Sequence, residues 1–220
     1  MTLKAFLFDL DGTLIDSERF HYACWEETLA EYGVSINYED WIRHYAGIPL
    51  PANARTLTEK YHIALPLDEF IARREALTYE RLKTSNIGLM PYAQEFLNFL
   101  VSKKLRIALV TSSPGADVGL ILEKNGLRKY FEVIITRSDV THSKPDPESY
   151  TVCREKMGLL QAECIAFEDT LNGTKSAKAA GIMCFAIQEN KEEHAKLAVA
   201  DKVFPNFNEA KAFLIARQLV

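Results

Sequence analysis

Short apolar segments that alternate with segments of helical pattern most restrict the fold of this chain. The apolar segments are rich in Ile, Val and Phe, as is typical of strands buried on both faces of a sheet. They cover residues 4–9, 106–111, 132–136, 164–169, 183–187 and, more weakly, 202–204. The helical patterns cover residues 91–103, 114–125, 147–157, 171–180 and 207–219. This order predicts an α/β fold, namely a Rossmann-like, doubly wound and mainly parallel sheet with helices on both faces.

Residues 17–85 interrupt this alternation. They contain no convincing strand and several amphipathic helical patterns, such as "SERFHYACWEETLAEYG" at residues 17–33. We therefore expect two domains. Residues 1–16 and 86–220 would form the α/β core, and residues 17–85 would form an all-helical insert.

The composition excludes several classes of protein. A formal charge of −4, with no Lys/Arg run longer than two residues, does not suggest a nucleic-acid surface. The four cysteines are widely spread and form no Cys-x-x-Cys pair, which favours reduced thiols over disulfides or a zinc site. The first apolar run ends at Asp9, too early for a signal peptide or a membrane span. We expect a cytoplasmic protein, monomeric and without a membrane partner.

Polar and charged residues follow the predicted strands at the points where these end. Right-handed crossovers place the carboxyl ends of parallel strands at one edge of the sheet, which is where open α/β sheets bind ligands. The residues that this rule brings together are Asp9, Asp11, Thr111, Ser112, Ser113, Lys144, Glu168 and Asp169. The sequence therefore predicts one site that contains four carboxylates, a hydroxyl cluster and one lysine.

Carboxylates gathered in this way need a compensating positive charge. Two like charges about 4 Å apart repel by roughly 4 kcal/mol at an effective dielectric constant near 20. A hard divalent cation removes this repulsion, and all-oxygen ligands favour Mg²⁺. Lys144 and the Thr111 hydroxyl are then available to bind an anion. The combination indicates a phosphoryl-transfer site.

Two other interpretations of the first motif are weaker. Asp-Gly is a favoured turn pair, so "LDGT" alone would more often be a turn. An EF-hand loop that uses Gly12 as its glycine would place Asp9, Asp11 and Glu18 at ligand positions, but Leu7 would then stand where the first Asp is required. The preceding run also resembles a strand and not a helix.

Four motifs in this order resemble those of the haloacid dehalogenase superfamily of phosphohydrolases. They are "DLDGT" at residues 9–13, the strand that ends in Thr111, "KPDP" beginning at Lys144, and "EDTLNG" at residues 168–173. The resemblance extends over nearly the whole chain. The helical insert between the first and second motifs resembles the mobile cap of the β-phosphoglucomutase-like subgroup.

The resemblance implies a role for each motif. Asp9 would attack phosphorus and form an aspartyl-phosphate, and Asp11 would serve as general acid and base. Mg²⁺ would be bound by Asp9, the backbone carbonyl of Asp11 and Asp169, with Glu168 as a ligand or next to one. The phosphoryl oxygens would be bound by Thr111, the amide of Ser112 and Lys144. Ser113 would cap a helix that begins at Pro114, so that a helix dipole also faces the anion.

The insert carries one candidate and one departure from the subgroup. His21 matches a histidine that contributes to catalysis in sugar phosphomutases, although its spacing from Trp25 on one helix also suits packing. In those mutases a Ser-Arg pair grips a second phosphate, whereas this chain has "GIPL" at residues 47–50, so Leu50 replaces the arginine. The nearest alternative is Arg55.

The missing arginine favours hydrolysis of a small phosphate monoester, similar to a sugar phosphate, over isomerisation. A phosphomutase and a non-catalytic regulator that binds a phosphorylated ligand remain alternatives. Dehalogenase chemistry is less favoured, because it has no use for the acid/base carboxylate of Asp11.

Overall fold

The computed structural model describes residues 3–220 of the protein, which form two compact units. The core unit comprises the described residues up to Asp16 together with Gly88–Val220, and the helical unit comprises Ser17–Ile87. The helical unit ends at Ile87 in this division, and the sequence predicted an end at residue 85. No helix within residues 3–220 combines the length and the hydropathy that crossing a membrane requires.

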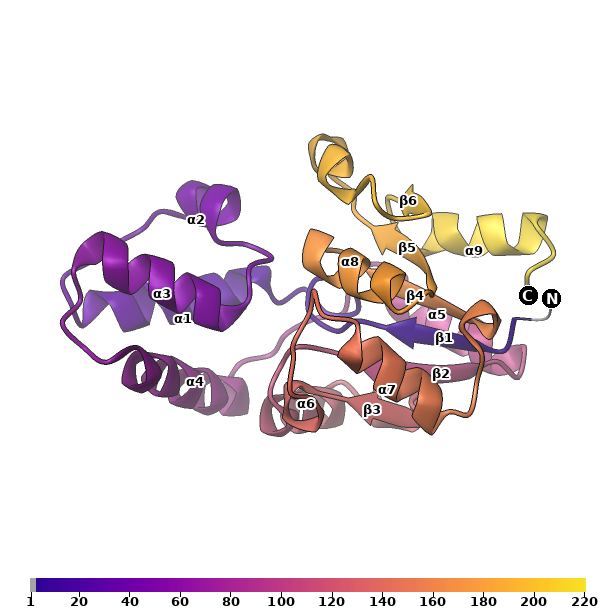
Figure 1. Ribbon diagram of the computed structural model, residues 1–220, viewed down its shortest axis with the longest axis horizontal. Coiled ribbons are helices and arrows are strands. Elements are labelled where there is room, and N and C mark those ends of the chain that lie inside the picture. The colour runs from indigo at the N-terminus through magenta and orange to yellow at the C-terminus, as the bar shows by residue number, and fades with distance from the viewer. Residues whose placement is uncertain (1–2) are drawn as a thin grey trace. The chain divides into compact units, whose positions relative to one another are not determined.

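One parallel sheet of six strands, as far as residues 3–220 show, organises the core unit (Figure 1). Its strands lie in the order β3-β2-β1-β4-β5-β6, and every neighbouring pair is parallel. The strands are β1 (Ala5–Phe8), β2 (Arg106–Val110), β3 (Val133–Ile135), β4 (Cys164–Glu168), β5 (Met183–Ile187) and β6 (Lys202–Phe204). The strand order reverses between β1 and β4, which confirms the predicted doubly wound, Rossmann-like α/β fold.

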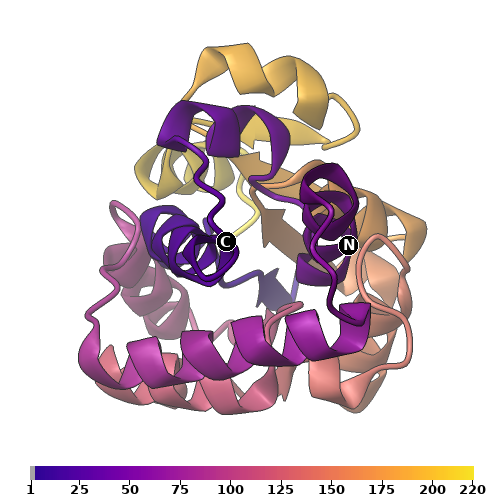
Figure 2. The same cartoon turned by 90° about the vertical axis from the view of Figure 1, so that its left-hand side faces the viewer.

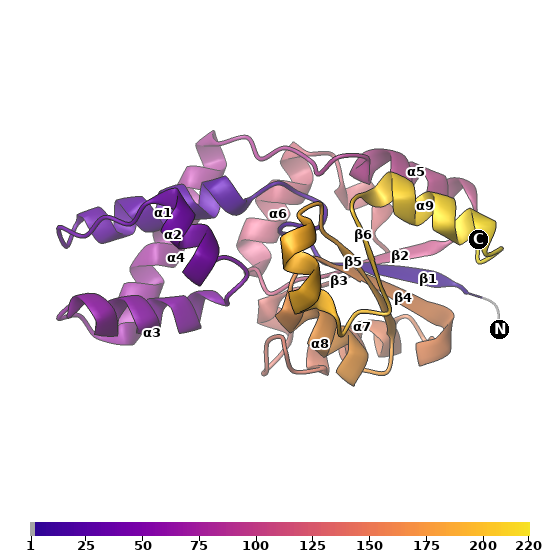
Figure 3. The same ribbon diagram turned by 90° about the horizontal axis from the view of Figure 1, so that it is seen from above.

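The helices of the core unit cover both faces of this sheet, with α5 and α9 on one side and α7 and α8 on the other (Figure 3). They are α5 (Ala93–Ser102), α6 (Gly115–Lys124), α7 (Glu148–Lys156), α8 (Leu171–Ala179) and α9 (Phe207–Ala216). Short 3₁₀ turns are η1 (Arg128–Tyr130), η2 (Arg137–Asp139), η3 (Gln161–Glu163) and η4 (Lys191–Leu197).

The two sheet faces are packed differently. On the side of α5 and α9, stacked and edge-on rings join the sheet to the helices, and these rings are Phe6, Phe8, Phe96, Phe167 and Phe207. On the side of α7 and α8, smaller side chains such as Ala166, Ala177 and Cys153 pack around Tyr150, which is completely buried. The four cysteines are buried and form no disulfide within residues 3–220.

Helices α1 (Glu18–Ala30), α2 (Tyr38–His44), α3 (Leu50–Tyr61) and α4 (Leu67–Thr84) form the helical unit. All of residues 17–87 are described and contain no strand (Figure 2). Trp25, Trp41 and Phe70 lie at the centre of its core. Arg74 is buried against the ring of Trp25, and one of its terminal nitrogens donates a hydrogen bond to the carbonyl of His21.

Candidate active site

The strand register brings Asp9 beside Glu168. Phe8 of β1 pairs with Phe167 of β4, and the next amide, that of Asp9, donates a hydrogen bond to the carbonyl of Phe167. Glu168 is the last residue of β4, and Asp169 follows it. The two acidic motifs therefore stand at the carboxyl ends of adjacent strands, where the strand order reverses and where ligands bind in folds of this type.

The ammonium group of Lys144 connects these carboxylates. Its Nζ donates hydrogen bonds to Oδ1 of Asp9 at 2.6 Å, to Oε1 of Glu168 at 2.6 Å and to the carbonyl of Val110 at 2.8 Å. A lysine ammonium has three N–H donors, so all three are used. Lys144 reaches this position from the loop before α7, where its peptide bond to Pro145 is cis.

Burial and charge shift the pKa values of these groups in a consistent way. Burial raises the pKa of Asp9, and the charge of Glu168 adds to this effect while Lys144 opposes it. Burial also raises the pKa of Asp169, and the charges of Asp9 and Glu168 raise it further. Burial alone would lower the pKa of Lys144, but the attraction of Asp9 and Glu168 outweighs it, so the net shift is upward. Lys144 therefore stays protonated.

Three carboxylates of the site suit a metal ion. Asp9, Glu168 and Asp169 each place a ligand atom within 4.8 Å of the others. In their ionised form, which binds metal, their combined negative charge exceeds the single positive charge of Lys144, and their ligand atoms are all oxygen, as Mg²⁺ prefers. The residues present fit a divalent cation at this point of the site.

Two glycines leave the room that these carboxylates occupy. Gly12 has φ +76°, and a Cβ there would overlap the carboxylate of Asp169. A Cβ on Gly173, in the first turn of α8, would overlap the carboxylate of Glu168. Thr13 is also buried and donates a hydrogen bond from its hydroxyl to Oδ1 of Asp169 at 3.1 Å. Gly12 and Thr13 of the first motif therefore help to fix the position of the Asp169 carboxylate in the last motif.

Asp11 lies apart from these three carboxylates and contacts the segment after β2. The Ser113 hydroxyl donates a hydrogen bond to Oδ2 of Asp11 at 2.6 Å. The Ser113 amide donates to the Thr111 hydroxyl oxygen at 3.0 Å. Thr111 itself is buried and follows β2 directly, and Ser112 lies between the two.

This geometry corrects the predicted role of Ser113. The sequence suggested that Ser113 caps a helix whose first residue is Pro114. Helix α6 instead begins at Gly115, Pro114 occupies the cap position, and the hydroxyl of Ser113 binds Asp11. The metal role predicted for Asp11 concerned its backbone carbonyl and stays a prediction.

His21 lies in the helical unit, on α1, where its ring packs edge-on against that of Phe20. Leu50 begins α3, and Arg55 lies exposed on the same helix. The predicted contact of His21 with a substrate stays a prediction.

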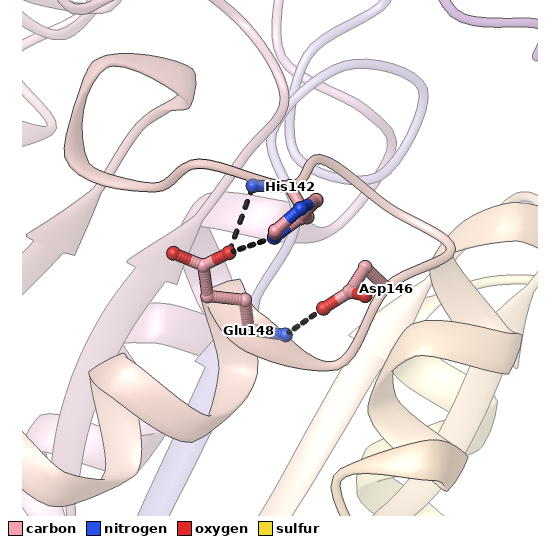
Figure 4. Close-up of side chains that lie close together, drawn as sticks. All are labelled: His142, Asp146 and Glu148. Carbon is pink, nitrogen blue, oxygen red and sulfur yellow. Dashed lines mark hydrogen bonds and ion pairs between the residues drawn. The ribbon is translucent and has the colours of Figure 1, made fainter.

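A second group of possible metal ligands lies in the loop that carries Lys144 (Figure 4). His142, Asp146 and Glu148 point toward one another there, mostly exposed. The Glu148 carboxylate accepts hydrogen bonds from the amides of Thr141 and His142 and contacts Nδ1 of His142, while Asp146 accepts one from the amide of Glu148. These contacts tie the loop to the start of α7.

Tyr150 also belongs to the candidate active site, although the sequence did not predict it. Its hydroxyl donates a hydrogen bond to Oε1 of Glu168 at 2.6 Å, and Nζ of Lys144 lies 5.1 Å from the centre of its ring. Tyr150 lies in the first turn of α7 and packs among the buried side chains between this helix and the sheet. No local pattern tells which carboxylate its hydroxyl meets on another strand.

Comparisons with known proteins show the family of the chain. The family model described as haloacid dehalogenase-like hydrolase matches residues 6–187. Among curated proteins, the phosphorylated carbohydrates phosphatase of Thermotoga maritima is 32% identical over 180 residues, which are 82% of each chain. The fructose-1-phosphate phosphatase YqaB of Escherichia coli is 27% identical over 80% of this chain and 92% of its own.

Solved structures share the fold over almost the whole chain. A hydrolase from Pseudomonas syringae superimposes with a TM-score of 0.80 and 25% identity, over 97% of this chain and 98% of its own. The phosphate-bound CbbY of Rhodobacter sphaeroides gives a TM-score of 0.80 at 24% identity, over 94% and 95% of the two chains. The second likeness shows the fold alone.

Proposed function

The chain belongs to the haloacid dehalogenase-like hydrolase family and is a phosphatase, and we propose that it hydrolyses a small, sugar-phosphate-like monoester with the help of Mg²⁺. The observation that carries this proposal is the position of Lys144, whose ammonium bridges Asp9 and Glu168 beside a cluster of carboxylates. This arrangement supports the proposal that the carboxylate of Asp9, the ammonium group of Lys144 and the metal ligands act on one phosphoryl group. The names of the two curated relatives support a phosphorylated carbohydrate or a related metabolite.

Asp9 is the proposed nucleophile. An oxygen of its carboxylate attacks phosphorus, the bond from phosphorus to the leaving alcohol breaks, and an aspartyl-phosphate forms. Because burial raises the pKa of Asp9, its ionised form depends on the nearby positive charge of Lys144. Water then attacks phosphorus, which releases phosphate and restores the carboxylate.

Asp11 is the proposed acid and base. It donates a proton to the leaving oxygen as the first step proceeds and removes a proton from water in the second. The hydrogen bond from Ser113 holds Oδ2 of Asp11. This contact orients the carboxylate for the transfer of the proton.

The phosphoryl oxygens are bound by Lys144, the hydroxyl of Thr111 and the amide of Ser112. The Thr111 oxygen accepts a hydrogen bond from the Ser113 amide, which orients its own proton away from that amide. Asp9, Asp169 and the backbone carbonyl of Asp11 would hold Mg²⁺, with Glu168 at or next to the ion. When bound, Mg²⁺ supplies charge neutralisation for the phosphoryl oxygens.

The helical unit is proposed to act as a cap that excludes water and selects the substrate. His21 is its candidate contact residue. The arginine that would grip a second phosphate in a mutase is replaced by Leu50, which favours a monophosphate.

The test is phosphate release from a panel of sugar, polyol, glycolate and nucleoside monophosphates, with Mg²⁺ and again with EDTA. We expect metal-dependent release from one or a few members, and loss of turnover in Asp9→Asn and in Asp11→Asn with the fold retained. Release that EDTA does not reduce, or full activity in either variant, would contradict the proposal. If no member is hydrolysed, isomerisation of β-glucose-1-phosphate with a bisphosphate primer tests the mutase alternative.

A further inference from the structure

Glu168 is a buried carboxylate whose hydrogen bonds are concentrated on one atom. It is 1% exposed, and its Oε1 accepts hydrogen bonds from Nζ of Lys144 and from the hydroxyl of Tyr150, each at 2.6 Å. A buried carboxylate that loses its hydrogen-bond donors is strongly destabilised. The hydrogen bonds that Glu168 accepts therefore affect the free energy of the site both before and after a substrate binds.

Lys144 cannot serve all its acceptors once a phosphoryl group arrives. Its three N–H groups are used by Asp9, Glu168 and the carbonyl of Val110. A hydrogen bond to phosphate, which the proposed function requires, must replace one of these three. When the bond to Glu168 is the one released, the hydroxyl of Tyr150 remains as its donor.

The packing around Tyr150 holds its side chain in place during this exchange. It is 0% exposed and belongs to the cluster of small buried side chains between the sheet and α7 and α8. Its ring face lies below Lys144, with 5.1 Å between Nζ and the ring centre. Tyr150 thus contacts both partners of the ion pair, with its hydroxyl on Glu168 and its ring on Lys144.

We propose that Tyr150 is a positioning residue that keeps Glu168 hydrogen-bonded while Lys144 turns to the phosphoryl group of the substrate. This inference rests on the proposed function and extends it. Without the hydroxyl, Glu168 retains Lys144, and phosphate has to compete with a buried carboxylate for the same ammonium. The penalty is incurred when the substrate binds and persists in the transition state, so it raises KM and leaves kcat nearly unchanged.

The test compares Tyr150→Phe with the wild-type protein. Phenylalanine preserves the ring and removes only the hydroxyl. The affinity of the Mg²⁺-loaded protein for inorganic phosphate is measured by calorimetry, and kcat and KM are measured with a substrate that the wild-type protein hydrolyses. Tyr130→Phe is the matched control, because its hydroxyl donates to Oδ1 of Asn98 in the same unit and away from the site.

We expect Tyr150→Phe to weaken phosphate binding about tenfold and to raise KM to a similar extent, with kcat within about twofold of the wild type. Tyr130→Phe should change none of these values. Unchanged phosphate affinity, or a fall in kcat at constant KM, would overturn the proposal while leaving the phosphatase assignment intact. Failure of Tyr150→Phe to fold would also overturn it, because the hydroxyl would then serve the fold and not the site. Wild-type protein without Mg²⁺-dependent hydrolysis would instead contradict the proposed function.

Discussion

The α-carbon of Gly12 lies against the carboxylate of Asp169, so that no side chain fits between them. Gly12 also has φ +76°, which L residues with a side chain rarely adopt. A glycine is thus required at position 12 for two reasons. One is the backbone angle at this position, and the other is the nearby carboxylate of Asp169, which lies far away in the sequence.

Gly12→Ala separates these two reasons when it is compared with Gly158→Ala. Gly158 has φ +65°, but a Cβ there meets nothing within 4 Å. Both variants should lose about 1–2 kcal/mol of stability from the backbone angle. Only Gly12→Ala should also displace Asp169 and weaken Mg²⁺ binding, by at least about tenfold. Calorimetric titration with Mg²⁺ and thermal unfolding of both variants measure this, and equal Mg²⁺ affinities would contradict it.

Ser113→Ala removes the hydrogen bond to Oδ2 of Asp11. The carboxylate then loses one fixed partner at the point where it handles a proton, so we expect kcat to fall about tenfold, with a smaller change in KM. Steady-state kinetics measure this. Ser102→Ala is the control, because the Ser102 hydroxyl bonds only locally to the carbonyl of Phe99 on the surface of α5. A kcat like that of the wild type would show that Asp11 does not need Ser113.

Mg²⁺ binding should release protons. Burial raises the pKa values of Asp9 and Asp169, and both must be ionised to bind the metal. Protons therefore compete with Mg²⁺ more strongly as the pH falls, and the apparent affinity should decrease in the same direction. Calorimetric titrations in buffers with different ionisation enthalpies count the protons released. An affinity independent of pH, with no proton release, would contradict the raised pKa values.

Asp139 provides a stability test on a carboxylate that is not among the proposed catalytic or metal-binding residues. Its carboxylate accepts hydrogen bonds from the hydroxyl of Thr136 at 2.7 Å and from its amide at 2.9 Å, and these bonds lower its pKa. A lowered pKa means that the stabilisation is present above the unfolded-state pKa, about 3.9, and is lost as the pH falls through the folded-state value. Asp139→Asn should therefore destabilise the protein at neutral pH by about 0.5–1 kcal/mol, because the group is partly exposed.

Urea unfolding of Asp139→Asn and of the wild type across the acid range measures this difference. The two free energies of unfolding should converge at low pH, where Asp139 is protonated in the wild type. A difference that stays constant with pH would assign the effect to packing and not to charge.

The sequence predicted most of the fold because the strands are buried on both faces. A short unbroken apolar run such as "MCFAI" is typical of a buried parallel strand. Strands β5 and β6 begin and end at the predicted residues. Helices α8 and α9 begin at the predicted residues, whereas α5, α6 and α7 begin one or two residues after the proline that was predicted as their first residue. At Pro91 the next residue, Tyr92, has φ 64°, and α5 begins only at Ala93. Proline fixes its own backbone angle but not that of its neighbour.

The site was predictable where a strand end determined it and not where a tertiary contact did. Asp9 and Glu168 follow from strand order alone, since parallel strands share one edge. The partner of Asp11 did not follow, because Ser113 serves equally well in sequence as a helix cap. Tyr150 could not be assigned either, because its hydroxyl meets Glu168 only after α7 packs on the sheet.

The most direct test of the proposed mechanism is the detection of the covalent aspartyl-phosphate on Asp9. The protein is quenched with acid during turnover of a substrate from the panel, and its peptides are analysed by mass spectrometry. We predict one phosphate, labile to hydroxylamine, on the peptide that contains Asp9, and none in Asp9→Asn. Turnover without any phosphorylated peptide, together with an Asp9→Asn variant that keeps the wild-type rate, would contradict Asp9 as the nucleophile.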